Sequence, residues 1–145
     1  MNTQLRSEKR SQRGVTLVEI LVVLAIIGLL AGLVGPQVLN ALGGAKSKTA
    51  LIQIRDIEQA LEMYKLDVGR YPNNAQGLSA LVQKPSGASG WNGPYLKNGK
   101  LPPDPWGTDF LYRYPGEQTE FDIYTLGEDA SPGGDGESRD IGNWE

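Results

Sequence analysis

The sequence Arg13-Gly14-Val15-Thr16-Leu17-Val18-Glu19 leads directly into an apolar run that decides how this chain folds. From Ile20 to Gly35 the run contains only Ile, Leu, Val, Ala and Gly, and Pro36 closes it. Together with residues 15–18, the run is long enough to cross a bilayer as an α-helix, which needs ~20 residues. Its one charge is Glu19. A charge at the centre of a membrane-spanning helix costs roughly 2.5–3.5 kcal/mol, so we expect this glutamate to have a function and a partner.

The segment ahead of the run, residues 1–14, is polar and basic. It carries a net charge of +3 within a chain whose net charge is −3, so the rest of the chain carries −6. Because lysine and arginine favour the cytoplasmic side of a membrane, we expect everything after Pro36 to lie on the opposite side. An exported segment this acidic is not expected to bind nucleic acid.

The position of the small residue Gly14 indicates a membrane anchor and not a secreted, soluble protein. An ordinary secretory signal is cut after its apolar core, at small residues. Here the small-residue junction flanked by basic charge precedes the core. A cut between Gly14 and Val15 would leave the apolar segment in place as the new N-terminal helix.

Two residue types that carry much protein chemistry are missing, because the chain has no histidine and no cysteine. It therefore has no disulfide, no thiol nucleophile, and neither the commonest general base nor the commonest zinc ligand. About 110 residues follow Pro36, which is enough for one small core.

Beyond Pro36 the sequence predicts an amphipathic helix and then a small sheet. Apolar residues recur at helical spacings of three and four, namely Leu51, Ile54, Ile57, Leu61, Tyr64 and Val68. A short helix is expected around Ala75 to Gln83. Alternating residues from Phe110 to Tyr114 and from Phe121 to Thr125 predict two strands, with residues 115–118 as the turn. The expected fold is α+β: a long N-terminal helix, with a membrane-spanning half and an amphipathic half, packed on a small antiparallel β-sheet.

Two interpretations of Glu19 follow from the residues alone. In the first, the side chain merely sits near the lipid headgroups, since four residues place it only ~6 Å along the helix from Val15. In the second, a cut after Gly14 frees an α-amine on Val15, and Glu19 of one subunit pairs with that amine on a neighbour. Such a pair would hide two costly charges together and would set the register in which subunits assemble.

The C-terminal loop, residues 126–140, is rich in acids and glycines. The last 29 residues of the chain contain nine acids and one arginine, a pattern typical of a solvated acidic tail. Oxygen-bearing side chains and glycine turns also suit Ca²⁺, which takes 6–8 oxygen ligands. Counting Asp129 as position 1, Ser131 stands at 3, Gly134 at 6 and Asp140 at 12. These are EF-hand spacings, but most of that motif is missing. The residues leave both interpretations open.

The stretch from Gly14 to Glu19, followed by the apolar run, resembles the prepilin motif of type IV pilins and type II secretion pseudopilins. The resemblance implies that a prepilin peptidase cuts after Gly14 and methylates Val15. The family most often begins its mature chain with Phe, whereas this chain would begin with Val15. The positions that the resemblance implies for assembly are Thr16, Glu19 and Pro36.

The remainder of the chain resembles the major pseudopilins of type II secretion systems. Four segments carry this similarity: Tyr64–Pro72, Gln76–Leu81, Leu101–Gly107 and Asp140–Trp144. The resemblance implies a homopolymer, a short periplasmic pseudopilus that helps to export folded proteins across the outer membrane. Its implied partners are the prepilin peptidase, the minor pseudopilins and the inner-membrane platform of the secretion system.

The resemblance also implies where the parts of the chain lie. Residues 1–14 would be a cleaved leader, residues 15–36 a single-pass helix in the inner membrane, and residues 37–145 a periplasmic domain. Major pseudopilins bind Ca²⁺ in the C-terminal loop. The ligands carried over to this chain are the carbonyls of Leu126 and Ser131 and the side chains of Asp129, Asp135 and Asp140.

Two alternatives are weighed against this structural role. A membrane-anchored periplasmic enzyme could use Asp104 and Asp109 as an acid–base pair, but the sequence offers no nucleophile–base pair and no recognisable catalytic loop. A type IV pilin or a minor pseudopilin is a nearer alternative. We expect a structural subunit and not an enzyme.

Overall fold

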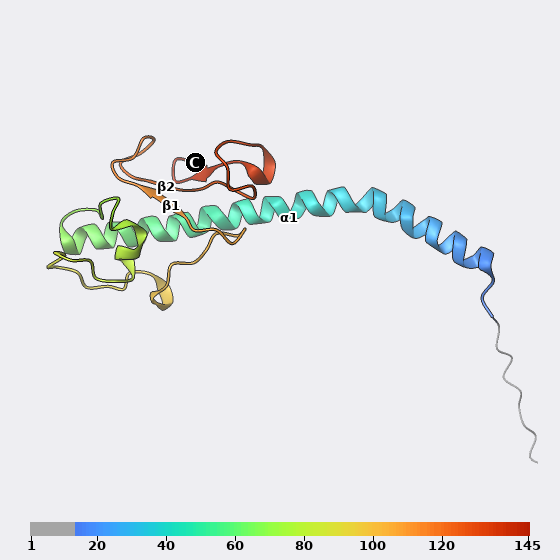
Figure 1. The fold of residues 1–145 in the computed structure, drawn as a ribbon, viewed down its shortest axis with the longest axis horizontal. Coiled ribbons are helices and arrows are strands. Elements are labelled where there is room, and N and C mark those ends of the chain that lie inside the picture. Colours follow the sequence, from blue (N-terminus) through green and yellow to red (C-terminus); the bar gives the residue numbers. More distant parts are fainter. Residues whose placement is uncertain (1–13) are drawn as a thin grey trace, which may run out of the picture. The chain divides into compact units, whose positions relative to one another are not determined.

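The computed structural model describes residues 14–145, apart from the side chains of residues 39–42. The predicted leader up to Arg13 lies outside the described residues. Within them, the chain forms a long helix, three short 3₁₀ helices and three strands (Figure 1). In chain order these are α1 (Leu17–Val68), η1 (Gly77–Leu81), η2 (Lys97–Gly99), β1 (Leu111–Arg113), β2 (Asp122–Thr125), η3 (Gly136–Ser138) and β3 (Ile141–Gly142). The chain divides into two compact units, Met1–Leu39 and Asn40–Glu145.

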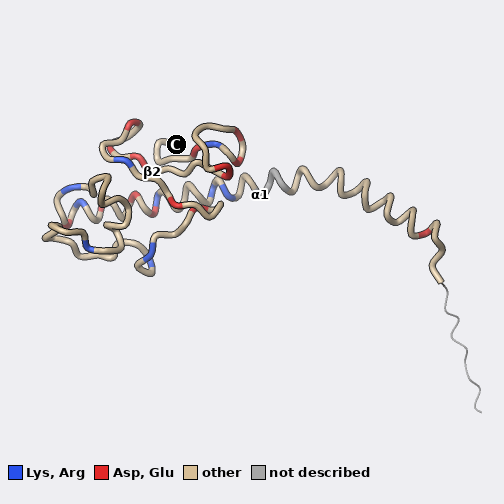
Figure 2. The backbone as a smooth tube through the Cα atoms, in the orientation of Figure 1, with Lys and Arg blue, Asp and Glu red and all other residues tan. Residues whose placement is uncertain are grey.

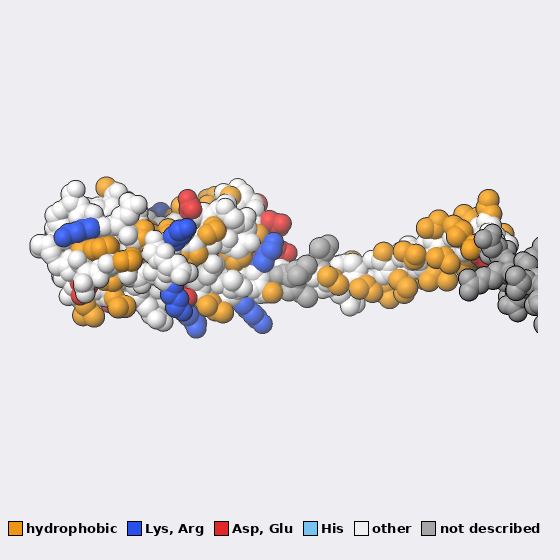
Figure 3. All heavy atoms as spheres, turned by 90° about the horizontal axis from the view of Figure 1, so that it is seen from below, with side chains coloured by type: hydrophobic (Ala, Val, Ile, Leu, Met, Phe, Trp, Pro, Cys, Tyr) orange, Lys and Arg blue, Asp and Glu red, His pale blue; other side chains and the backbone are white. Residues whose placement is uncertain are grey.

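In the first unit, α1 is apolar on every side. Its large apolar side chains from Leu17 to Val38 are 49–75% exposed, and hydrophobic side chains cover much of the face of this segment seen in Figure 3. Among the described residues, α1 alone is long and apolar enough to span a bilayer. A helix with apolar side chains all round is stable only when lipid or other helices cover it.

In the second unit, the amphipathic part of α1 forms one wall of the core. Its fully buried positions follow the predicted helical spacing and are Ala50, Ile54, Ile57, Ala60, Leu61 and Tyr64. Leu51 and Val68, which the periodicity also selects, are partly buried and pack against this core. The opposite wall includes Phe121, Ile123 and Ile141.

The sheet has the strand order β1-β2-β3, and both pairs are antiparallel. Tyr112 of β1 lies opposite Ile123 of β2, and Thr125 of β2 lies opposite Ile141 of β3. The predicted β1–β2 hairpin and the α+β fold are therefore confirmed, although both strands are shorter than predicted. Strand β3 is not predicted from the sequence, because two residues are too few to show an alternating pattern.

The predicted short helix exists, but it is a 3₁₀ helix limited to Gly77–Leu81. It is preceded by a reciprocal pair of hydrogen bonds between Asn73 and Gln76. The Asn73 side chain accepts the Gln76 N–H at 2.9 Å, and the Gln76 side chain accepts the Asn73 N–H at 3.0 Å. Leu78 and Leu81 are buried.

Candidate functional site

The predicted cleavage junction lies just ahead of α1. Gly14, Val15 and Thr16 are exposed and are not helical, and the helix begins at Leu17. The predicted cleavage bond between Gly14 and Val15 therefore lies outside the helix and is exposed.

Thr16 and Glu19 form a capping box at the start of α1. The Glu19 Oε2 atom accepts the Thr16 backbone N–H at 2.8 Å and the Thr16 hydroxyl at 2.9 Å. In return, the Thr16 Oγ1 atom accepts the Glu19 N–H at 3.2 Å. Threonine followed three residues later by glutamate is the known pattern for this motif. The sequence therefore contains a local signal for this motif, in addition to the features that predict the helix.

The capping box explains how a single chain keeps Glu19 in place, but it does not neutralise the charge. Both hydrogen bonds go to Oε2, and among the described residues none donates to Oε1. The motif involves the Val15–Thr16 peptide and not the bond before Val15, so it survives a cut after Gly14. The carboxylate is thus fixed and remains able to attract a cation.

Charge is distributed unevenly along the backbone, as Figure 2 shows. The apolar part of α1 carries a single acid, Glu19, near its start.

Pro36 lies inside α1 and is exposed. Since proline has no N–H, it removes one hydrogen bond from the helix at that point.

The C-terminal loop is closed by a few hydrogen bonds. The Asp140 Oδ2 atom accepts the Gly133 N–H at 3.0 Å, and the Asp129 Oδ1 atom accepts the Ser131 N–H at 3.1 Å. Gly133 has a φ of 90°, a conformation that side chains other than glycine rarely adopt. The Asp140 Oδ1 atom is buried and has no hydrogen-bond partner among the described residues.

The predicted metal ligands differ in how exposed they are. Asp129, Ser131 and Asp135 are exposed, and Leu126 and Asp140 are half-buried. Within residues 14–145, no three acidic side chains lie close enough together to hold a metal by themselves. A cation here would need backbone carbonyls as well as carboxylates.

Asp104, one of the two acids considered for catalysis, holds a turn together. Its carboxylate accepts the backbone N–H groups of Trp106 and Thr108 at 3.0 and 2.8 Å, and the hydroxyls of Thr108 and Thr125. Burial alone would raise the pKa of this carboxyl, but these hydrogen bonds outweigh burial and hold the pKa below its ordinary value. Asp109 is exposed. Asp104 therefore has a structural role.

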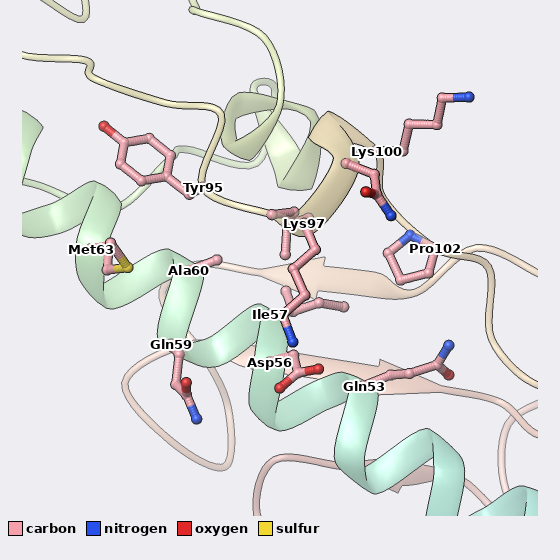
Figure 4. A pocket seen from close by; sticks show the side chains of 12 residues that line it. Gln53, Asp56, Ile57, Gln59, Ala60, Met63, Tyr95, Lys97, Lys100 and Pro102 are labelled. Carbon is pink, nitrogen blue, oxygen red and sulfur yellow. The ribbon is translucent and has the colours of Figure 1, made fainter.

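A groove of about 420 Å³ lies between α1 and the segment around η2 (Figure 4). Gln53, Asp56 and Met63 line it from α1, and Lys97 and Pro102 line it from the facing segment. Neither Asp104 nor Asp109 lines this groove. The groove is thus separate from the acids that the catalytic hypothesis selected.

Comparison with known proteins gives consistent matches along the chain. Residues 37–144 match a family described as type II secretion system (T2SS), protein G, and residues 9–35 match the prokaryotic N-terminal methylation motif. The chain is 49% identical over 142 residues to the type II secretion system core protein G of Pseudomonas aeruginosa, covering 95% of this chain and 99% of that protein. It is 46% identical over 138 residues to the core protein G of Vibrio cholerae, covering 93% of each.

A solved structure is similar as well. The crystal structure of the major pseudopilin from the type 2 secretion system of enterohaemorrhagic Escherichia coli matches with a TM-score of 0.60 and 36% sequence identity. The match covers 70% of this chain and 88% of that chain.

Proposed function

Because the chain belongs to the type II secretion system protein G family, we propose that it is a structural filament subunit. It polymerises through its N-terminal helix into a short pseudopilus that helps to drive folded proteins across the outer membrane. The relatives favour this role over a type IV pilin or a minor pseudopilin, because they are core G proteins and a major pseudopilin. The function of a filament subunit requires no catalysis.

The observation that carries the proposal is a helix with exposed apolar side chains all round and one fixed carboxylate near its start. In the membrane, lipid covers these side chains, and in a filament the helices of neighbouring subunits replace the lipid. Cleavage after Gly14 gives Val15 a positive α-amine, and methylation leaves that charge in place. Glu19 of one subunit then pairs with Val15 of the next, which removes two isolated charges from the apolar interior.

Processing and location follow from the same proposal. A prepilin peptidase removes residues 1–14 and methylates Val15, a step that the match of residues 9–35 to the methylation motif supports. Residues 15–36 anchor the subunit in the inner membrane before assembly, and residues 37–145 form a periplasmic domain. The positively charged leader favours this orientation. Minor pseudopilins and the inner-membrane platform are the proposed partners in assembly.

The C-terminal loop is also proposed to bind calcium. The carbonyls of Leu126 and Ser131 and the carboxylates of Asp129 and Asp140 would hold the ion, with Asp135 as a further ligand. These oxygen donors suit a hard cation. A buried carboxylate oxygen without a partner, as at Asp140 Oδ1, is destabilising, and a cation would satisfy it. A bound ion would hold the loop closed and add its binding free energy to the stability of the fold.

The central step can be tested on the full chain, produced together with a prepilin peptidase and the secretion platform. Intact-mass measurement should show the loss of residues 1–14 and the gain of one methyl group, and electron microscopy should show short filaments. A Gly14→Val variant should keep its leader and form no filaments. Filaments built from unprocessed chains would contradict the proposal.

A further inference from the structure

Glu137, in η3 of the C-terminal loop, lies directly against α1. Gly43 of α1 is buried, and a Cβ atom built on it would collide with the Glu137 side chain. A Cβ atom built on the next residue, Gly44, would meet nothing. The placement of the Glu137 side chain against the helix therefore requires glycine at position 43 but not at position 44.

The Glu137 carboxylate reaches two other side chains. Its Oε2 atom lies 3.7 Å from the Lys46 Nζ atom and accepts the Trp106 Nε1–H at 3.4 Å. The Glu137 backbone carbonyl accepts the Glu128 N–H at 2.9 Å, which closes the loop on itself. Glu137 thus joins α1, the turn held by Asp104 and the C-terminal loop at one point.

A hollow of about 450 Å³ lies beside Glu137, lined by Gly44, Ser47 and Lys48 from α1 and by Arg139 from the loop. Arg139 is engaged elsewhere, because its guanidinium makes two hydrogen bonds to Glu145 at 2.7 and 2.9 Å. The Glu137 contact therefore borders an open space between the loop and α1.

The helix needs support at this point. Glycine in a helix interior is about 1 kcal/mol less favourable than alanine, and Gly43 and Gly44 follow one another. A contact that forms only when Glu137 is in place would stabilise this turn of α1. Gly43 thus leaves room for the Glu137 side chain, and the Glu137 side chain in turn stabilises the helix around Gly43.

We propose that Glu137 is a positioning residue that docks the C-terminal loop onto α1 at Gly43. Closure of the loop then orders the helix from Gly43 to Leu51, and an ordered helix in turn keeps the loop closed. Calcium binding by the loop rests on the proposed function above. Where calcium closes the loop, the closure stabilises residues 43–51 of α1 through Glu137.

Hydrogen–deuterium exchange of the full processed chain in detergent micelles tests this docking. Glu137→Ala should speed exchange about 2–10-fold in peptides covering residues 43–51, the loss expected for one part-exposed ion pair and one hydrogen bond. Asp109→Ala, which removes an exposed acid outside the loop, should leave those peptides at the wild-type rate. Unchanged exchange in Glu137→Ala would overturn the proposal.

Gly43 and Gly44 supply a matched second test, in which hydrogen–deuterium exchange is measured in the loop and not in the helix. Gly43→Ala and Gly44→Ala improve helix propensity equally, but only the first displaces Glu137. Gly43→Ala should therefore speed exchange in residues 134–140, whereas Gly44→Ala should not. Equal exchange of the loop in the two variants would refute docking at Gly43.

Added calcium separates this inference from the metal proposal. In the wild type, calcium should slow exchange both in the loop and in residues 43–51, and in Glu137→Ala it should slow exchange in the loop alone. No effect of calcium on the wild-type loop would contradict the metal site only. Equal slowing of residues 43–51 in both proteins would contradict transmission through Glu137.

Discussion

Replacing Glu19 by glutamine separates the two roles that the structure and the proposed function give to this side chain. Glutamine is accepted at the same position of a capping box, so Glu19→Gln keeps the hydrogen bond from the Thr16 N–H. It removes the negative charge, so it cannot pair with the Val15 amine of a neighbouring subunit. Thr16→Val is the matched change, because it weakens the capping box and keeps the charge.

The two roles predict effects of different size. Losing a helix cap costs about 0.5–2 kcal/mol. In Thr16→Val the hydrogen bond from the backbone N–H of residue 16 to Glu19 would survive, so assembly should weaken less than about tenfold. Leaving a charge unpaired in an apolar interior costs about 3–5 kcal/mol, which corresponds to roughly a 100- to 4,000-fold weaker assembly.

The assay compares how much processed chain must accumulate in the membrane before filaments form. Glu19→Gln should insert and be processed normally, yet form no filaments at a level at which the wild type and Thr16→Val do. If Glu19→Gln assembled like the wild type, the charge pair would be refuted. If Thr16→Val failed as completely as Glu19→Gln, capping and not pairing would explain the glutamate.

Three further predictions concern the domain after Pro36. Asp104→Ala should destabilise the folded chain by about 3–5 kcal/mol, because it leaves two backbone N–H groups and two hydroxyls without their acceptor. The control Asp109→Ala should change stability by less than about 0.5 kcal/mol. Similar melting temperatures for the two variants would contradict the structural role of Asp104. Because the folded state lowers the pKa of Asp104, this carboxylate should add its full contribution to the free energy of unfolding above about pH 4, near the pKa of an aspartate in the unfolded chain, and lose it as the pH falls through the lower folded pKa. Denaturant unfolding across this range should show a smaller pH dependence in Asp104→Asn than in the wild type. Equal pH dependence in the two proteins would contradict the lowered pKa. Calcium should raise the melting temperature of the wild type and not of Asp140→Asn, and chelation should reverse the rise; a melting curve indifferent to calcium would remove the metal site.

The elements that the sequence predicted are those that local patterns determine. The buried face of α1 follows the spacing of Ile54, Ile57 and Leu61, and the β1–β2 hairpin follows the alternation of aromatic residues. These patterns arise because one face of each element must be covered. The capping box was equally local, since Thr16 and Glu19 stand three residues apart, and it could have been predicted.

The features that were missed depend on contacts between distant residues. Strand β3 has only two residues, and it exists because the C-terminal loop returns Ile141 to the side of Thr125. Asp104 could be seen as an acid beside prolines, but not as the acceptor of the Thr125 hydroxyl from strand β2. The contact between Gly43 and Glu137 joins residues far apart in the chain, and no periodicity indicates it.

The candidate calcium loop lies between these cases. Its composition was visible in the sequence, and the structure adds the buried Asp140 Oδ1 atom and the hydrogen bond from Gly133 to Oδ2. The spacing of acids could not specify which of Asp129, Asp135 and Asp140 converge, because glycine turns set the path of the loop.

Imaging of assembled filaments at side-chain resolution would show whether Glu19 and Val15 of adjacent subunits form the proposed ion pair. A carboxylate oxygen of Glu19 should lie within about 4 Å of the methylated Val15 nitrogen of an adjacent subunit, the separation that defines an ion pair. A Val15 nitrogen that faces water, or that has no acidic side chain of another subunit nearby, would contradict the account.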